Sequence, residues 1–147
     1  MSDYSGPGVY EIVPFHANGM SLNVWGGGKS AGTQVKLYQR SPNSQNAQFE
    51  IVAAGGTQAH PENGDREYHI IAVHSGLYIA ANVTTELRSP LDASIRWKLT
   101  RVGNGAFYNA GAKKQLNVRG AGKDAGTELI TYDFAEASNS QFFLKLV

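Results

Sequence analysis

A chain of 147 residues with a formal net charge of +1, 17 glycines and no cysteine is long enough for one domain with a sizeable core. The balanced charge excludes the strongly basic surface that is typical of nucleic-acid binding. The lack of cysteine excludes a disulfide scaffold and a thiol nucleophile. No apolar run could span a bilayer, and the first residues lack the basic start and apolar stretch of a signal peptide. We therefore expect a cytoplasmic protein, or one released by a non-standard route, without membrane insertion.

The first third of the chain predicts four short strands. Apolar and polar side chains alternate over residues 9–14, 20–25, 34–38 and 48–52, and turn-forming residues bound each segment. Asn18-Gly19 separates the first two segments and predicts a tight hairpin between them.

Helical signals are weak along the whole chain, because no segment carries a sustained helical period. A single helical turn is expected in each of two polar loops, 41–45 and 134–138, which precede aromatic strands. Asn63-Gly64 and Asn104-Gly105 are expected to mark the joints between thirds of the chain.

The chain also repeats itself. Residues 22–33 return as residues 116–127, and both copies begin Leu-Asn-Val and end Ala-Gly-Thr. Each copy then reaches a tyrosine and an Asn-x-Gln-Phe motif, which starts at Asn46 in one copy and at Asn139 in the other. Shared turn chemistry alone does not produce such matching, so the pattern indicates a repeat architecture.

A middle copy is weaker but recognisable. Residues 68–74 parallel residues 10–16, and the aromatic markers Phe49, Trp97 and Phe142 are 48 and 45 residues apart. Three repeats of about four strands follow, at approximately 7–53, 66–100 and 106–147 within a single domain of residues 1–147. Such small sheets must pack around a common axis, and closing them removes exposed edges. The sequence thus predicts an all-β fold, a β-trefoil, with a β-sandwich or another barrel as the alternative.

A set of polar and aromatic residues recurs in the first and third repeats. Asn23, Gly26, Tyr38 and Asn46 each have a counterpart in the third repeat. The counterparts are Asn117, Gly120, Tyr132 and Asn139. Together they offer amide groups that donate and accept, exposed backbone and a flat ring. A sugar needs this set, because its hydroxyls donate and accept while one ring face carries only C–H groups.

The middle repeat lacks both asparagines, since Ala80 and Ser94 stand in their places. This loss favours a middle repeat that keeps the fold without the site. The residues alone leave a structural interpretation open, because asparagine before glycine is common in turns and a tyrosine often packs in the core. Leu22, Leu116 and the three aromatic markers are expected in the core.

The order aliphatic-Asn-Val, glycines, Leu-Tyr and Asn-x-Gln-Phe resembles the ricin-B-type lectin repeat. The start, with Val9-Tyr10-Glu11-Ile12-Val13 and then Leu22-Asn23-Val24-Trp25, is similar to small fungal agglutinins of the Sclerotinia and Rhizoctonia type. The resemblance covers nearly the whole chain. It departs from the ricin pattern where Asn23 replaces the usual aspartate and where Ala47 replaces the glutamine of the Q-x-W motif.

This resemblance implies a non-enzymatic lectin for terminal galactose or N-acetylgalactosamine. It implies that Asn23 and Asn46 bond ring hydroxyls and that Tyr38 packs on the apolar sugar face. It further implies that Lys36 reaches an outer hydroxyl and that Trp25 contacts an acetamido group or walls the site. The expected carbohydrate-binding residues are Asn23, Trp25, Gly26, Lys36, Tyr38, Asn46, Asn117, Arg119, Gly120, Tyr132 and Asn139. It also implies a homodimer, with glycans and glycoproteins that end in galactose or N-acetylgalactosamine as partners.

Other functions have less support. A β-trefoil protease inhibitor has no reason to retain the asparagine pattern, and a protein-binding trefoil predicts a basic or apolar patch. Residues 26–30 resemble the end of a phosphate-binding loop, but Asn23 stands where the first glycine is required. His16 and His74 occupy equivalent repeat positions, which favours a structural role over a metal site. We expect no catalytic residue, metal or cofactor.

Overall fold

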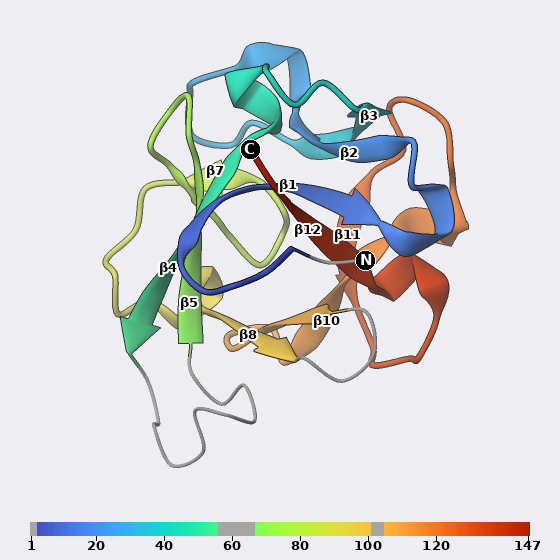
Figure 1. The fold of residues 1–147 in the computed structure, drawn as a ribbon. Coiled ribbons are helices and arrows are strands. Elements are labelled where there is room, and N and C mark those ends of the chain that lie inside the picture. Colours follow the sequence, from blue (N-terminus) through green and yellow to red (C-terminus); the bar gives the residue numbers. More distant parts are fainter. Residues whose placement is uncertain (1–2, 56–66, 101–104) are drawn as a thin grey trace.

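The computed structural model describes residues 3–55, 67–100 and 105–147, which form short strands and single turns of 3-10 helix (Figure 1). The strands of the first group are β1 (Gly8–Pro14), β2 (Met20–Val24), β3 (Val35–Gln39) and β4 (Phe49–Gly55). The second group has β5 (Glu67–Ala72), β6 (Tyr78–Ile79), β7 (Thr85–Glu86) and β8 (Trp97–Thr100). The third has β9 (Ala106–Asn109), β10 (Lys114–Val118), β11 (Leu129–Tyr132) and β12 (Phe142–Leu146). The 3-10 turns are η1 (Phe15–Ala17), η2 (Trp25–Gly27), η3 (Gln45–Ala47), η5 (Ala93–Ile95), η6 (Arg119–Ala121) and η7 (Ser138–Ser140).

The first and last strands of each group build a barrel. Antiparallel pairing runs from β12 to β1, then to β4, β5, β8 and β9 in turn. A hydrogen bond of 3.0 Å from the Phe142 N–H to the Gly105 carbonyl links β12 to the residue before β9. Figure 1 shows β1 and β12 side by side across the centre, with β4 and β5 paired beside them.

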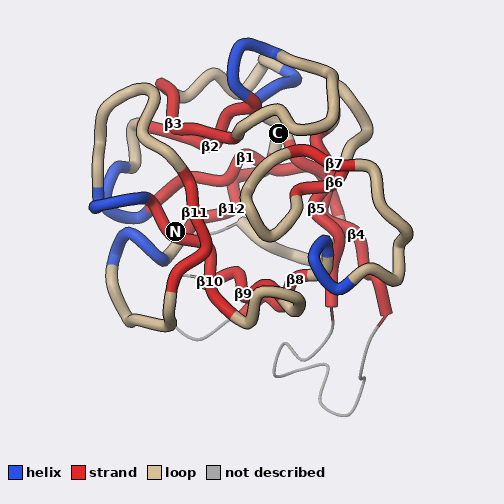
Figure 2. The backbone as a smooth tube through the Cα atoms, turned by 180° about the vertical axis from the view of Figure 1, so that it is seen from behind, coloured by secondary structure: helices blue, strands red, loops and turns tan. Residues whose placement is uncertain are grey.

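The two inner strands of each group form a hairpin, namely β2–β3, β6–β7 and β10–β11. These hairpins meet one another, because the Leu37 N–H donates to the Thr127 carbonyl at 2.9 Å and the Val35 N–H to the Val83 carbonyl at 3.1 Å. Figure 2 shows the strands from behind, where the hairpins lie around the barrel. A barrel with one such hairpin per repeat is a β-trefoil, which confirms the predicted fold class and rejects the sandwich.

The core lies inside the barrel and under the hairpins. Phe49, Trp97 and Phe142 are at most 1% exposed, as the repeat markers predicted. Leu22 and Leu116 are also buried. The indole N–H of Trp97 donates to the Ile79 carbonyl at 2.9 Å, so burial of this ring leaves no polar atom unpaired.

Local predictions from turn residues were less accurate. Asn18-Gly19 was expected to close a hairpin, but β1 pairs with β12 and β4, and β2 pairs with β3. The 3-10 turn η1 connects β1 to β2 instead. The helical turns expected within 41–45 and 134–138 occur slightly later, as η3 and η7. Asn63-Gly64 and Asn104 lie outside the described residues.

No helix in the described part of the chain is long and apolar enough to cross a membrane.

Candidate binding pockets

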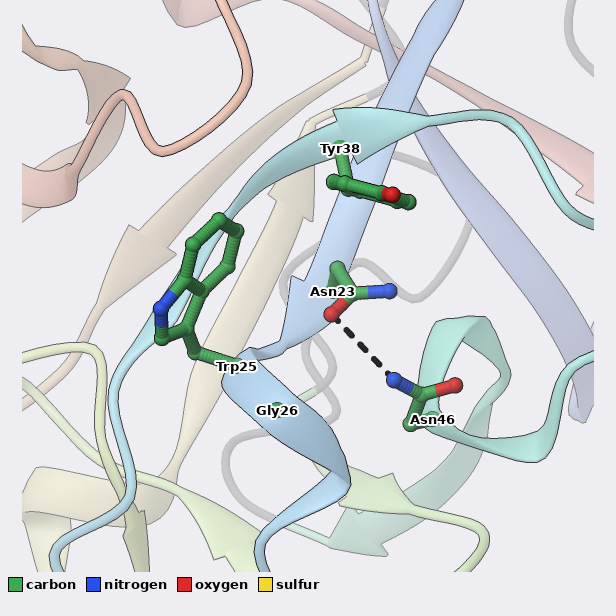
Figure 3. Close-up of a pocket in the computed structure, with 5 residues that line it drawn as sticks. All are labelled: Asn23, Trp25, Gly26, Tyr38 and Asn46. Atoms are coloured by element: carbon green, nitrogen blue, oxygen red, sulfur yellow. Dashed lines mark hydrogen bonds between the residues drawn. The ribbon is translucent and has the colours of Figure 1, made fainter.

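A shallow pocket of about 380 Å³ lies at the end of the first hairpin (Figure 3). Its lining residues are Asn23 on β2, Trp25 and Gly26 in η2, Tyr38 on β3 and Asn46 in η3. All five were singled out from the sequence. Strand pairing brings them together, since the β2–β3 register places Asn23 opposite Lys36 and Ser21 opposite Tyr38.

The two asparagines of this pocket hold each other. The Asn46 amide nitrogen donates to the Asn23 side-chain oxygen at 3.2 Å and to the Val24 carbonyl at 3.3 Å. Within the described part of the chain, the Asn23 nitrogen and the Asn46 oxygen have no further hydrogen bond. Figure 3 shows both atoms, and the Tyr38 hydroxyl, pointing to the same side. The pocket therefore presents a donor beside an acceptor, under an aromatic ring.

The aromatic residues of the pocket lie at its rim. Tyr38 is 44% exposed, so the interpretation of this tyrosine as a core residue is wrong. Trp25 meets Tyr38 edge to face, with ring centroids 6.1 Å apart. The Lys36 ammonium does not line the pocket but lies 5.2 Å from the centroid of the Trp25 ring, as a cation–π pair. Lys36 thus covers one face of the Trp25 ring.

A second pocket, of about 510 Å³, lies at the equivalent end of the third repeat. Five of its lining residues were expected from the sequence, namely Asn117, Arg119, Gly120, Tyr132 and Asn139. Three were missed, namely Ile130, Ala135 and Ala137. Ile130 is the counterpart of Lys36, so the repeat alignment contained its signal. The two alanines lie in the loop where the repeats differ in length, and no sequence match identifies them. Tyr132 is 57% exposed, so it too is not a core residue.

Hydrogen bonding inside the second pocket differs from that in the first. Asn139 donates to the Val118 carbonyl at 3.0 Å, as Asn46 does to Val24. Asn117, however, donates from its amide nitrogen to the Ser140 hydroxyl at 2.7 Å. Its side-chain oxygen accepts no bond within the described residues, so this pocket presents an acceptor where the first presents a donor.

Charge also separates the two pockets. Arg119 replaces Trp25 at the rim and lies 3.6 Å from the carboxylate of Glu128, and both side chains are largely exposed. Such an exposed pair contributes little to stability, typically below about 1 kcal/mol. The second pocket therefore has one aromatic wall and one charged wall in place of two rings.

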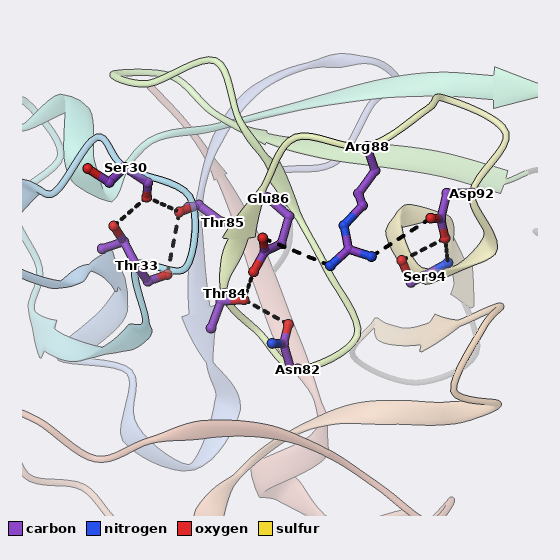
Figure 4. Close-up of polar contacts among 9 residues, drawn as sticks. All are labelled: Ser30, Thr33, Asn82, Thr84, Thr85, Glu86, Arg88, Asp92 and Ser94. Carbon is purple, nitrogen blue, oxygen red and sulfur yellow. Dashed lines mark hydrogen bonds and ion pairs between the residues drawn. The ribbon is translucent and has the colours of Figure 1, made fainter.

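The middle repeat fills the corresponding place with its own polar contacts (Figure 4). Ile79 pairs with Thr85 as Leu22 pairs with Leu37, so Glu86 occupies the position of the pocket tyrosine. Its carboxylate accepts from the Thr84 hydroxyl at 2.6 Å and lies 3.9 Å from the Arg88 guanidinium. A charged, internally paired side chain thus replaces the aromatic face.

Asp92 and Ser94 complete this polar chain. The Ser94 hydroxyl and N–H both donate to the Asp92 carboxylate, at 2.7 and 2.9 Å. These bonds, with a smaller contribution from Arg88, hold the pKa of Asp92 below its usual value. Ser94 stands at the position of Asn46, and its N–H and hydroxyl are held by Asp92, the residue that caps the turn η5. That the middle repeat has no sugar site stays a prediction, and these contacts show only that its polar groups pair with one another.

Outside the pockets, Arg40 also has a shifted pKa. Glu11 is buried on β1 and accepts from the Arg40 guanidinium at 2.7 Å, which raises the pKa of Arg40. No group of three or more metal-ligating side chains occurs among residues 3–55, 67–100 and 105–147.

No family model matches the chain. The chain is 29% identical to the agglutinin of Sclerotinia sclerotiorum over 153 aligned positions, which cover 95% of this chain and 96% of that protein. The solved agglutinin of Rhizoctonia solani matches with a TM-score of 0.74 at 16% identity and covers 100% of both chains. The C-half of the earthworm R-type lectin, solved in complex with GalNAc, matches with a TM-score of 0.70 at 15% identity over 95% of this chain and 98% of that one.

These matches agree with the repeat motifs and with the topology of the barrel and hairpins. At their low identities the two solved structures support the fold, whereas the Sclerotinia agglutinin extends the similarity to the sequence itself. The chain is thus similar along nearly its whole length to the small fungal agglutinins and has the β-trefoil fold of the ricin-B-type lectins.

Proposed function

We propose that the protein is a lectin that binds terminal galactose or N-acetylgalactosamine at the pockets of its first and third repeats. Its agglutinin relative and lectin neighbours indicate a carbohydrate-binding protein without enzymatic activity. The observation that carries the proposal is the shared geometry of the two pockets, each with an asparagine pair beside an exposed tyrosine. The earthworm lectin, solved in complex with GalNAc, supports this class of sugar.

In the first pocket, the proposed sugar stacks its C–H face on Tyr38. One ring hydroxyl then accepts from the free Asn23 nitrogen, and its neighbour donates to the free Asn46 oxygen. Vicinal hydroxyls 3 and 4 of galactose fit this pair, because each can donate and accept. Trp25 forms the adjacent apolar wall, where an acetamido methyl group packs.

Binding at one such pocket is expected to be weak. Shallow single-sugar sites bind near millimolar concentrations, or about −4 kcal/mol. Two pockets per chain, doubled in the homodimer that we propose, raise the apparent affinity for a multivalent surface by roughly 10²–10⁴. Cross-linking of glycoproteins follows from this valency.

Calorimetric titration of N-acetylgalactosamine into four proteins tests the proposal. The wild type should bind at two sites, Asn23→Ala and Asn117→Ala at one site each, and the double variant at none. Each asparagine is only slightly exposed, at 6% and 7%, so its loss removes a hydrogen bond that water replaces poorly.

Asn43→Ala is the matched control, because Asn43 is an exposed asparagine in the loop that leads to Asn46. It should bind as the wild type does. Unchanged binding by the double variant would reject the site assignment. Absence of binding to a panel of galactosides by the wild type would reject the sugar class.

A further inference from the structure

We propose that His74 and His16 are positioning residues that hold the glycine loop of each pocket from a neighbouring repeat. The loops are η2 with Gly28 and η6 with Gly122. The part of this inference that concerns ligand affinity rests on the proposed sugar-binding function. The part that concerns the loops rests on the contacts of the protein alone.

Each histidine reaches across a repeat boundary to one carbonyl. His74, in the middle repeat, has its Nε2 atom 2.8 Å from the Gly28 carbonyl oxygen in the first repeat. His16, in the first repeat, has its Nε2 atom 2.8 Å from the Gly122 carbonyl oxygen in the third. A carbonyl only accepts, so Nε2 carries the hydrogen in both rings. In each ring the Nδ1 atom is buried and has no partner among the described residues, so the bond to the loop is the polar contact that the structure gives that ring.

The loops need such a contact, because they have unusual backbone conformations. Gly26 and Gly27 have φ of 65° and 66° in η2, and Gly120 and Ala121 have φ of 60° and 54° in η6. The left-handed conformation costs alanine roughly 1 kcal/mol, and glycine loses much entropy when it is held. Each loop also supplies a pocket wall, through Trp25 and Gly26 or through Arg119 and Gly120.

The third repeat boundary differs in a way that supports the inference. Asn109 pairs with Trp97 as Pro14 pairs with Phe142. Because Trp97 and Phe142 are equivalent repeat markers, Asn109 and Pro14 occupy equivalent positions. Two residues further on, Gly111 therefore occupies the position of His16. A Cβ atom at Gly111 would lie 2.9 Å from the backbone of Ser94 in the middle repeat. No histidine therefore stands at the boundary between the third and the middle repeat. The middle repeat is the one that lacks the asparagine pair.

Hydrogen exchange without ligand provides the first test. The Gly28 N–H donates to the Trp25 carbonyl and the Gly122 N–H to the Arg119 carbonyl, so these two amides report on the two loops. In His74→Phe, which keeps a ring but loses the donor, exchange at Gly28 should be about fivefold faster and exchange at Gly122 unchanged. His16→Phe should give the reverse. Faster exchange at both amides in both variants, or at neither, would overturn the proposal.

Sugar titration provides the second test. In the Asn117→Ala background, which leaves only the first pocket, His74→Phe should weaken N-acetylgalactosamine binding roughly three- to tenfold, while His16→Phe should not. In the Asn23→Ala background, which leaves only the second pocket, His16→Phe should weaken binding and His74→Phe should not. Equal losses from either histidine would overturn the proposal.

A conservative variant separates the hydrogen bond from packing. His74→Gln keeps a side-chain N–H and should restore most of the exchange protection of Gly28, whereas exchange as fast as in His74→Phe would count against the bond. If the wild type binds no sugar but the crossed exchange pattern appears, the loop contacts stand and the proposed sugar function fails.

Discussion

One side chain in each pocket decides the direction of an amide group. Ala47 follows Asn46 in the first repeat, and its side chain has no polar atom. The Asn23 side-chain oxygen therefore accepts from the Asn46 amide nitrogen at 3.2 Å. In the third repeat Ser140 stands in that place, and its hydroxyl accepts from the Asn117 nitrogen at 2.7 Å. The equivalent asparagines therefore differ, because Asn23 offers a donor to the first pocket and Asn117 offers an acceptor to the second.

Ser140→Ala should make the third pocket resemble the first. Loss of this buried hydrogen bond is expected to lower the free energy of unfolding by about 1 kcal/mol, measured by urea denaturation. The side-chain amide signals of Asn117 should move toward those of Asn23 in NMR spectra. Ala47→Ser is the reciprocal control, and amide signals that stay in place in both variants would contradict the assigned role.

At the scale of elements, η2 and η6 have the same shape but differ in strain. Gly27 and Ala121 occupy equivalent places with φ of 66° and 54°. The Cβ that alanine would add at Gly27 has no heavy atom within 4 Å, so backbone strain is the main difference between the loops.

Ala121→Gly should therefore stabilise the protein by about 0.5–1 kcal/mol, because relief of left-handed strain exceeds the entropy that glycine adds to the unfolded chain. Gly27→Ala should destabilise it by a similar amount. Urea midpoints of the two variants check this prediction, which fails if both substitutions change stability in the same direction.

Element boundaries also show where local patterns mislead. Asn18-Gly19 has the composition of a tight hairpin, yet both edges of β1 are occupied by β12 and β4. A turn dipeptide can close a hairpin only if its flanking strands have free edges facing each other. Pairing of β1 with β4 and with β12, which comes from the far end of the chain, removed that option.

At the scale of the whole molecule, Arg96 joins parts of the barrel that are distant in sequence. Its guanidinium forms an ion pair with Glu67 on β5 and donates to the carbonyls of Ala54 at 2.6 Å and Pro90 at 2.8 Å. Arg96 is only 8% exposed, so these partners, and not water, compensate the charge of its guanidinium.

Arg96→Met should lower the free energy of unfolding by about 3 kcal/mol, because it leaves the Glu67 carboxylate and two carbonyls without their donor. Arg88→Met is the control. Arg88 is 43% exposed and its ion pairs are 3.9 Å long, so its loss should cost less than about 1 kcal/mol. Calorimetric unfolding measures both, and equal losses would contradict the stated role of Arg96.

The sequence by itself determined the repeats, the trefoil, all five residues that line the first pocket and five of the eight that line the second. Alternation and self-similarity are properties of short segments, and three such segments have few ways to bury their faces. Only the tertiary structure decided that Tyr38 and Tyr132 are exposed at pocket rims, that Ser140 turns the amide of Asn117, and that each histidine serves a neighbouring repeat. Exposure and hydrogen-bond partners depend on residues that folding brings together from different repeats, so no local pattern could contain them.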